Sequence, residues 1–183
     1  MDKSGLEFQV ISNDFHPKIL RYLTQMVGEN EAEDLTQEVF VKVSKALENF
    51  RGECKLSTWI YRIATNTAID KMRAVSFELE TELSGFGSSD EIEDKVAWTG
   101  EDTLSSEQLV MQNEMYQCFM DYVKNLPVNY RTIVVLSELE SFTNNEIAEI
   151  LGLSLDVVKI RLHRGKTKLI QELKNNCKAE DWL

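Results

Sequence analysis

The sequence TNNEIAEILGLS, residues 143–154, decides the fold of the last third of this chain. Thr143 and Glu146 have the T-x-x-E spacing of a capping box, which predicts the start of a helix. A short turn that contains glycine follows, and Ser154 can cap a second helix over 155–174. Two helices joined by such a three-residue turn are typical of a helix-turn-helix.

The second of these helices has one apolar face and one basic face. On a helical wheel the apolar face is made of Leu155, Val158, Leu162, Leu169 and Leu173. Arg161, Arg164 and Lys168 lie nearly opposite, and Lys159 and Lys166 flank the apolar stripe. A basic face backed by an apolar one suits the major groove of DNA, because lysine and arginine contact phosphates and guanine edges. A solvated surface helix that is basic by chance is the alternative interpretation.

The first third of the chain predicts three more helices. Asn13 and Asp14 stand before Pro17, which suits the start of the first helix. Asn30, followed by acidic residues, predicts the N-cap of the second helix, and Ser57 predicts the cap of the third. Apolar residues recur at helical spacing: Ile19, Leu20, Leu23, Met26 and Val27 in the first helix, Leu35, Val39, Val43, Leu47 and Phe50 in the second, and Trp59, Ile60, Ile63, Ala64, Ile69 and Met72 in the third.

The loop before the third helix, together with that helix, forms a second constellation. It consists of Phe50, Arg51, Lys55, Trp59, Tyr61, Arg62, Asn66 and Arg73. Aromatic rings among basic and amide side chains suit single-stranded nucleic acid, since bases can stack while the backbone charge is neutralised. The alternative is that Trp59 simply packs in the core of a small helical domain, and spacing alone does not decide between the two.

The acidic residues are concentrated in one stretch of the chain. The net charge of −11 argues at first against a nucleic-acid partner, because DNA is a polyanion. Residues 74–112, however, carry ten acids and one base, so the rest of the chain sums to −2. The segment 155–169 carries five bases and one acid. The whole-chain charge therefore does not exclude DNA binding by the carboxyl-terminal part.

The composition predicts an all-α protein. Among 183 residues there are only 8 glycines and 2 prolines, which favours helices over many short strands. We expect two small helical domains, over 1–73 and 106–183, joined by an acidic flexible linker over 74–105 that is rich in Ser, Gly, Glu and Asp. Strand content should be close to nil.

Other kinds of chemistry find little support in the sequence. His16 and His163 lie far apart, and no HExxH, phosphate-binding glycine loop or nucleophile motif occurs, so we expect no enzyme, cofactor or metal. No apolar run approaches ~18 residues and the amino terminus lacks the features of a signal peptide, so we expect no membrane insertion. Cys54, Cys118 and Cys177 form no CxxC pair, which fits a reducing cytoplasm.

Two parts of the chain resemble one known family. The sequences AEDLTQEVF (32–40) and WIYRIATNTAID (59–70) closely resemble region 2 of bacterial sigma-70 family sigma factors, and the stretch from LP (126–127) through EIA (146–148) to VKIRLHRGK (158–166) resembles their region 4. An acidic linker in place of region 3 resembles the extracytoplasmic function (ECF) group. The resemblance covers roughly 15–73 and 106–174. It implies a dissociable subunit of RNA polymerase that directs promoter recognition, minus-10 melting and transcription initiation.

The resemblance also implies three contact surfaces. Residues expected to dock on the β′ clamp helices of the polymerase are Asp34, Gln37, Glu38 and Lys42. Residues expected to capture the melted minus-10 strand are Phe50, Arg51, Lys55, Ser57, Thr58, Arg62 and Asn66. Residues expected to read the minus-35 duplex are Lys159, Arg161, Arg164 and Lys168. Members often have a threonine and a serine where this chain has Val157 and Ile160, so its minus-35 preference should differ.

The partners implied by the resemblance are core RNA polymerase (β′ and β), promoter DNA and an anti-sigma factor. Two other classes stay open from the residues: a stand-alone helix-turn-helix regulator that binds an operator as a dimer, and a protein-binding adaptor. A simple repressor does not need the first third of this chain, and co-purification with core polymerase would separate the classes.

The linker carries an expectation of its own. Promoter elements about 17 base pairs apart lie ~60 Å apart at ~3.4 Å per pair, whereas a relaxed coil over 74–112 spans only ~35 Å. We therefore expect the linker to be stretched on a basic polymerase surface, with its acids in the place of nucleic acid; a plain solvated tether is the alternative.

Overall fold

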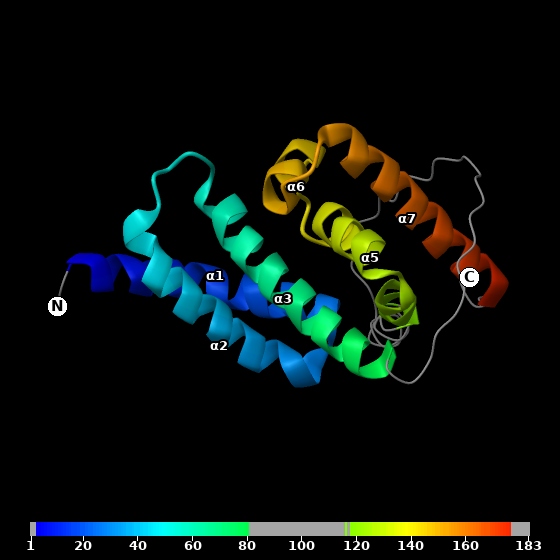
Figure 1. Cartoon of the computed structure of the whole chain (residues 1–183), viewed down its shortest axis with the longest axis horizontal. Coiled ribbons are helices and arrows are strands. Elements are labelled where there is room, and N and C mark those ends of the chain that lie inside the picture. The colour runs from blue at the N-terminus through cyan, green and yellow to red at the C-terminus, as the bar shows by residue number, and fades with distance from the viewer. Residues whose placement is uncertain (1–2, 81–115, 117, 177–183) are drawn as a thin grey trace, which may run out of the picture.

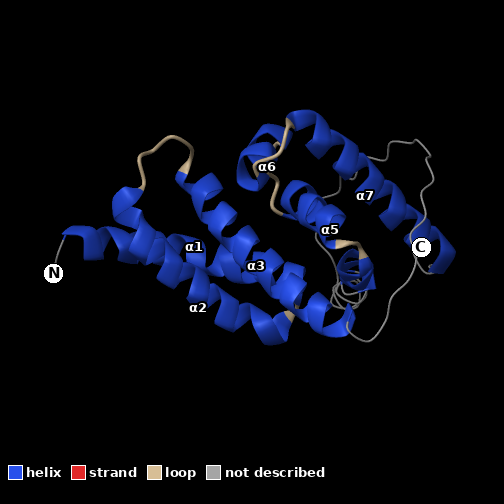
Figure 2. Cartoon of the chain, in the orientation of Figure 1, coloured by secondary structure: helices blue, strands red, loops and turns tan. Residues whose placement is uncertain are grey.

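The computed structural model of the chain describes residues 3–80, 116 and 118–176, and the statements below concern those residues. They form helices joined by short loops, with no strand among them (Figure 2), which confirms the all-α prediction. None of the described helices is long and apolar enough to cross a membrane.

Three helices form the amino-terminal domain: α1 (Lys3–Val27), α2 (Glu29–Ala46), which continues into the short 3-10 helix η1 (Leu47–Asn49), and α3 (Leu56–Glu80). Each buries part of the apolar stripe that the sequence predicted, and other predicted positions, such as Leu20, Trp59 and Ile69, are half-buried. Phe50, expected in the second helix, lies in the loop after η1. The fully buried residues include Ile19, Leu23, Met26, Val39, Val43, Ile60 and Ala64. Between α1 and α3 the buried Tyr22 hydroxyl shares a hydrogen bond of 2.8 Å with the Thr65 hydroxyl.

The boundaries of these helices differ from the prediction. Helix α1 begins at Lys3 rather than near Asn13 and contains Pro17, because Phe8 and the buried Ile11 continue its apolar stripe by further turns. The residue before α2 is Gly28 rather than Asn30; its φ of 96° favours glycine, and its N–H donates to the Thr24 carbonyl at 2.9 Å.

Helix α3 also differs at both ends. It starts one residue before Ser57, which therefore lies in the first turn, and it continues to Glu80, past the expected domain end at Arg73. The rest of the expected linker, and the acidic residues in it, lie outside the described residues.

The carboxyl-terminal domain contains a helical segment (116 and 118–125), α5 (Val128–Val134), the π-helical turn η2 (Val135–Leu139), α6 (Asn144–Leu151) and α7 (Leu155–Asn176). The predicted capping box is present: Thr143 N–H donates to Glu146 Oε2 at 3.0 Å, and Glu146 N–H donates to Thr143 Oγ1 at 3.3 Å. Gly152 ends α6 in the left-handed region at φ 63°, so the predicted helix-turn-helix is confirmed.

The two domains pack against each other. Helices α5, α6 and α7 lie across α3 from α2, with α6 beside the first half of α3 (Figure 1). The Tyr61 ring meets the Phe142 ring edge-on at 4.7 Å, so that the apolar core continues from one domain into the other.

Candidate nucleic-acid interface

The four residues predicted to contact polymerase share the exposed face of α2; they are Asp34, Gln37, Glu38 and Lys42. Leu35 and Val39 of the same helix are buried, as the pattern predicted. Lys42 pairs with Glu38 at 2.8 Å and donates to the Thr67 hydroxyl at 3.0 Å, so it ties α2 to α3. The face therefore offers the carboxylates of Asp34 and Glu38 to a basic partner.

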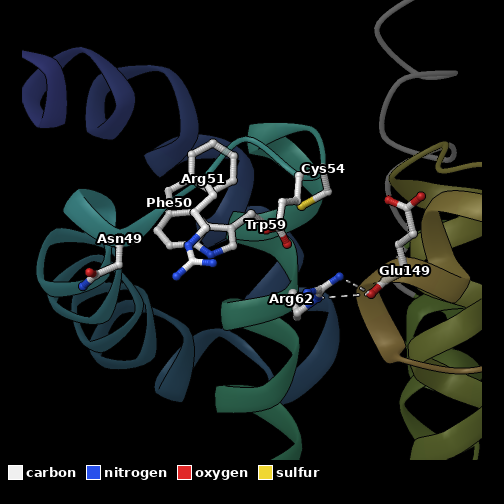
Figure 3. Close-up of a pocket in the computed structure, with 8 residues that line it drawn as sticks. Asn49, Phe50, Arg51, Cys54, Trp59, Arg62 and Glu149 are labelled. Carbon is white, nitrogen blue, oxygen red and sulfur yellow. Dashed lines mark hydrogen bonds between the residues drawn. The ribbon is translucent and has the colours of Figure 1, made fainter.

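An open pocket of about 530 Å³ lies where the loop after η1 meets α3 (Figure 3). It is lined by Asn49, Phe50, Arg51, Glu53, Cys54, Trp59, Arg62 and Glu149. The Phe50 and Trp59 rings lie 5.0 Å apart at an interplanar angle of 38°. Trp59 is half-buried, so it both packs against Phe50 and lines the pocket. Two aromatic rings beside arginines can stack an unpaired base and neutralise its phosphate.

Two basic side chains of this surface are held by the other domain. Arg62 donates from Nη2 and Nε to the Glu149 carbonyl of α6, at 2.6 and 3.1 Å (Figure 3). Lys55 pairs with Glu146 of α6 at 2.7 Å. Hydrogen bonds from Lys55, from the Thr143 backbone and from the Thr143 hydroxyl lower the pKa of Glu146 to about 2, and the Glu146 carboxylate raises the pKa of Lys55.

The predicted strand contacts do not all gather at the pocket. Phe50, Arg51 and Arg62 line it, whereas Ser57 is half-buried elsewhere and Asn66 is exposed on a later turn of α3. The prediction that Thr58 contacts the strand does not fit this arrangement. Thr58 is 0% exposed, so its side chain cannot reach a strand here. Its enclosed hydroxyl has no hydrogen-bond partner within the described part of the chain.

The basic face of α7 is open. Lys159, Arg164 and Lys168 are exposed and Arg161 is half-exposed, while Val158 and Leu169 are buried on the opposite side. Ile160 lies on this outer side with 52% of its surface exposed. Lys166, in contrast, pairs with Glu138 of η2 at 2.9 Å.

Sequence reasoning missed the residues that join the domains. The side chain of Glu140 is 2% exposed and accepts hydrogen bonds from Arg21 of α1, at 3.2 and 2.9 Å, and from the Tyr61 hydroxyl of α3, at 2.6 Å. Burial and then the Glu140 hydrogen bond raise the pKa of Tyr61. Arg131 of α5 donates to the Met26 carbonyl near the end of α1 at 2.8 Å, and burial lowers its pKa. No local pattern marks these residues, because their partners are 79 to 119 positions away.

Comparison with known proteins places both domains in one family. Residues 12–77 match the family model described as Sigma-70 region 2, and residues 116–169 match the model described as Sigma-70, region 4. The chain is 33% identical over 171 residues to the ECF RNA polymerase sigma factor SigW of Bacillus subtilis, covering 92% of this chain and 89% of that protein. It is 30% identical over 159 residues to the ECF RNA polymerase sigma-E factor of Haemophilus influenzae, covering 87% of this chain and 83% of that one.

The fold also matches a solved structure. The sigma factor RpoE of Bartonella quintana, in complex with the anti-sigma factor NepR, superposes with a TM-score of 0.66 at 22% identity, over 94% of this chain and 99% of that one. At this identity the match concerns the fold.

Proposed function

Because this chain belongs to the sigma-70 family, in its extracytoplasmic function group, we propose that its two helical domains read the two promoter elements separately. The chain acts with core RNA polymerase in transcription initiation. In our proposal the domain before residue 81 captures the minus-10 strand and the domain over 106–183 reads the minus-35 duplex. The acidic segment between them is the tether.

The observation that carries this proposal is the pocket beside α3. Phe50 and Trp59 offer faces for stacking, Arg51 and Arg62 offer positive charge, and a volume of about 530 Å³ is ample for one flipped base. Asn66 is exposed further along α3 and offers both a donor and an acceptor to the next nucleotide. Ser57 and Lys55 complete the surface on the side of the loop.

The duplex surface is the outer face of α7. Lys159, Arg161, Arg164 and Lys168 supply phosphate contacts and arginine forks for guanine. Ile160 cannot hydrogen-bond, so it favours a base pair that presents the methyl group of thymine in the major groove. This gives a physical reason for a minus-35 preference that differs from that of relatives with a hydroxyl there.

The polymerase surface is the exposed face of α2. The carboxylates of Asp34 and Glu38 make charge-assisted contacts with basic groups of the β′ clamp helices in our proposal. An anti-sigma factor that covers both domains is a further proposed partner. We also propose that the chain works in the cytoplasm and catalyses no reaction itself.

The test is reconstituted transcription. Core enzyme with this chain should give run-off transcripts from a subset of genomic fragments, and core enzyme alone should not. Asp34→Lys and Glu38→Lys should weaken the binding to core enzyme and leave helicity intact, because each introduces like-charge repulsion. Asp14→Lys, an equal charge change at an exposed site of α1, is the control. Unchanged affinity for core in both α2 variants would refute the polymerase surface, and transcripts that do not depend on the chain would refute the function.

A further inference from the structure

The contact between the domains is built from groups that would be costly to leave unpaired. The Glu140 carboxylate is almost fully buried, and both partners that the structure gives it, Arg21 and Tyr61, belong to the other domain. Removing one partner of a buried ion pair is strongly destabilising when the other charge stays buried. In the closed arrangement Arg21 and Tyr61 hold the Glu140 carboxylate, and parting the domains replaces these hydrogen bonds with hydration.

The segment that carries Glu140 has an unusual backbone. The π-helical turn η2 comes immediately before it, and Ser141 immediately after it has φ 58°, in the left-handed region that disfavours residues with a Cβ. Glu140 N–H donates to the Val135 carbonyl at 3.0 Å, and Phe142 N–H donates to the Leu136 carbonyl at 2.9 Å. This backbone directs Glu140 toward α1 and α3 rather than into its own domain.

Helix α6 occupies the positions that a nucleic-acid strand would need. The Glu149 carbonyl is one of the last four of α6, which have no partner inside the helix and carry the negative end of its dipole. Together with the Glu146 carboxylate, it presents negative charge to Arg62 and Lys55 as phosphate oxygens would. The strand and α6 therefore compete for the same two cations.

The closed arrangement is also too short for a promoter. Glu149 lines the pocket, α7 begins six residues later, and Arg161 lies six residues further along α7. Six residues span at most ~20 Å in extended chain and ~9 Å in helix. Arg161 is therefore within ~30 Å of the pocket wall, whereas elements about 17 base pairs apart are separated by ~60 Å. One closed chain cannot hold both elements.

From these observations we propose that the closed chain is autoinhibited: α6 blocks the strand surface, Glu140 latches the two domains, and the domains must part before promoter melting. The proposal rests on the proposed function for the identity of the competing strand. The latch itself is a property of the free chain.

The latch can be tested in the free, full-length chain. Two spin labels, attached at Glu48→Cys and Gln171→Cys with the three native cysteines changed to serine, report the distance between the domains from exposed positions. Glu140→Gln should lengthen and broaden this distance, and Arg21→Gln should do the same from the other side of the contact. Glu138→Gln is the matched control. It removes the same charge two residues before Glu140, and the ion pair that it breaks, with Lys166, lies within one domain.

Strand access is measured with a fluorescent single-stranded thymidine 12-mer. Glu140→Gln and Arg21→Gln should bind it about tenfold more tightly than Glu138→Gln, which corresponds to the loss of one charge-assisted hydrogen bond. An unchanged distance in both latch variants would overturn the latch, and open domains without tighter 12-mer binding would overturn the competition. Both results are independent of core polymerase, so a failure here is distinguishable from a failure of the proposed function. Circular dichroism of each variant verifies that the helices are retained.

Discussion

The two basic surfaces of this molecule differ in what their own chain does to them. On α7, none of Lys159, Arg161, Arg164 and Lys168 makes a hydrogen bond or ion pair with another residue of the described chain. Beside α3, Lys55 and Arg62 are both held by α6. The residue types are the same in the two places. The tertiary arrangement alone distinguishes the open basic face of α7 from the basic surface beside α3, whose Lys55 and Arg62 are held by α6.

Under the proposed function, this difference predicts an order for promoter recognition. A duplex can be contacted through phosphates by any exposed basic helix, and such contact is weak and reversible at physiological salt. In the proposed function, capture of a melted strand follows, and it needs two side chains that α6 holds in the closed arrangement: Lys55, which is paired with Glu146, and Arg62, which is bound to the Glu149 carbonyl. We therefore expect substitutions at the two surfaces to affect different steps.

The largest expected effect separates those steps directly. Arg62→Ala should lower open-complex formation about 10- to 100-fold, because a charge-assisted contact worth ~1.5–3 kcal/mol is lost. Arg164→Ala should instead weaken binding of the closed duplex and leave binding to a pre-melted template unchanged. Permanganate reactivity of the minus-10 thymines measures the first, and electrophoretic mobility shift measures the second. Equal defects on the pre-melted template would remove the distinction between the surfaces.

A second prediction concerns the packing that fixes α7. A Cβ on Gly165 would lie 2.9 Å from Val134 Cγ2 and 3.3 Å from Tyr130 Cβ, so α5 and α7 are close here because residue 165 has no side chain. Gly165→Ala should destabilise the carboxyl-terminal domain by ~1–2 kcal/mol, since overpacking outweighs the gain in helix propensity. Gln171→Ala, on an exposed site of the same helix, is the control. Urea unfolding followed by circular dichroism gives both values, and a stabilised Gly165→Ala variant would contradict the packing argument.

The helix-turn-helix could be predicted from sequence because its start and its turn depend on residues close together in the chain. The capping box at Thr143 and Glu146 and the left-handed Gly152 involve residues three to five positions apart, so the pattern contains all of the interacting groups. The start of α1 was wrong because Pro17, read as a first-turn residue, sits inside a helix whose apolar stripe begins earlier. The cap of α2 was wrong because Gly28 at positive φ separates it from α1 with no intervening loop.

The site was predictable only within each domain. The loop and α3 brought Phe50, Arg51 and Arg62 together as expected, since they are close in sequence. The burial of Thr58 could not be predicted, because helical phase within α3 depends on what packs against each side. Glu140, Glu146 and Glu149 have ordinary neighbours in sequence, and their roles arise from the docking of one domain on the other.

A smaller effect is expected at Ile160 on the duplex surface. Thymine and uracil differ only by the methyl group that an apolar, half-exposed Ile160 can contact. Ile160→Ser should therefore reduce the discrimination between these two bases in the minus-35 element by about two- to fivefold. Binding to duplexes that carry single deoxyuridine substitutions measures this. The control is Ser154→Ala, just before the start of the same helix. It should change the overall affinity for DNA but not the preference for the methyl group. The assignment of Ile160 fails if the variant and the parent discriminate equally at every position.

The smallest expected effect tests the contact of α6 with Lys55 through pH. The pKa of Glu146 is lowered to about 2, from an ordinary 4.5, by Lys55 first and then by the Thr143 backbone and hydroxyl. A carboxylate with a lowered pKa contributes stability that is fully present above pH 4.5 and is lost as pH falls toward 2. Glutamine at this position keeps the capping box and removes the charge. Glu146→Gln should therefore melt about 1–2 °C below the parent at pH 6, and the difference should shrink steadily between pH 4.5 and 2.5. The other acids of the chain are common to both proteins, so their protonation largely cancels in the comparison. A difference in melting temperature that stays constant over this range would show that Lys55 and Glu146 do not interact in solution, and α6 would then hold the strand surface through the Glu149 carbonyl alone.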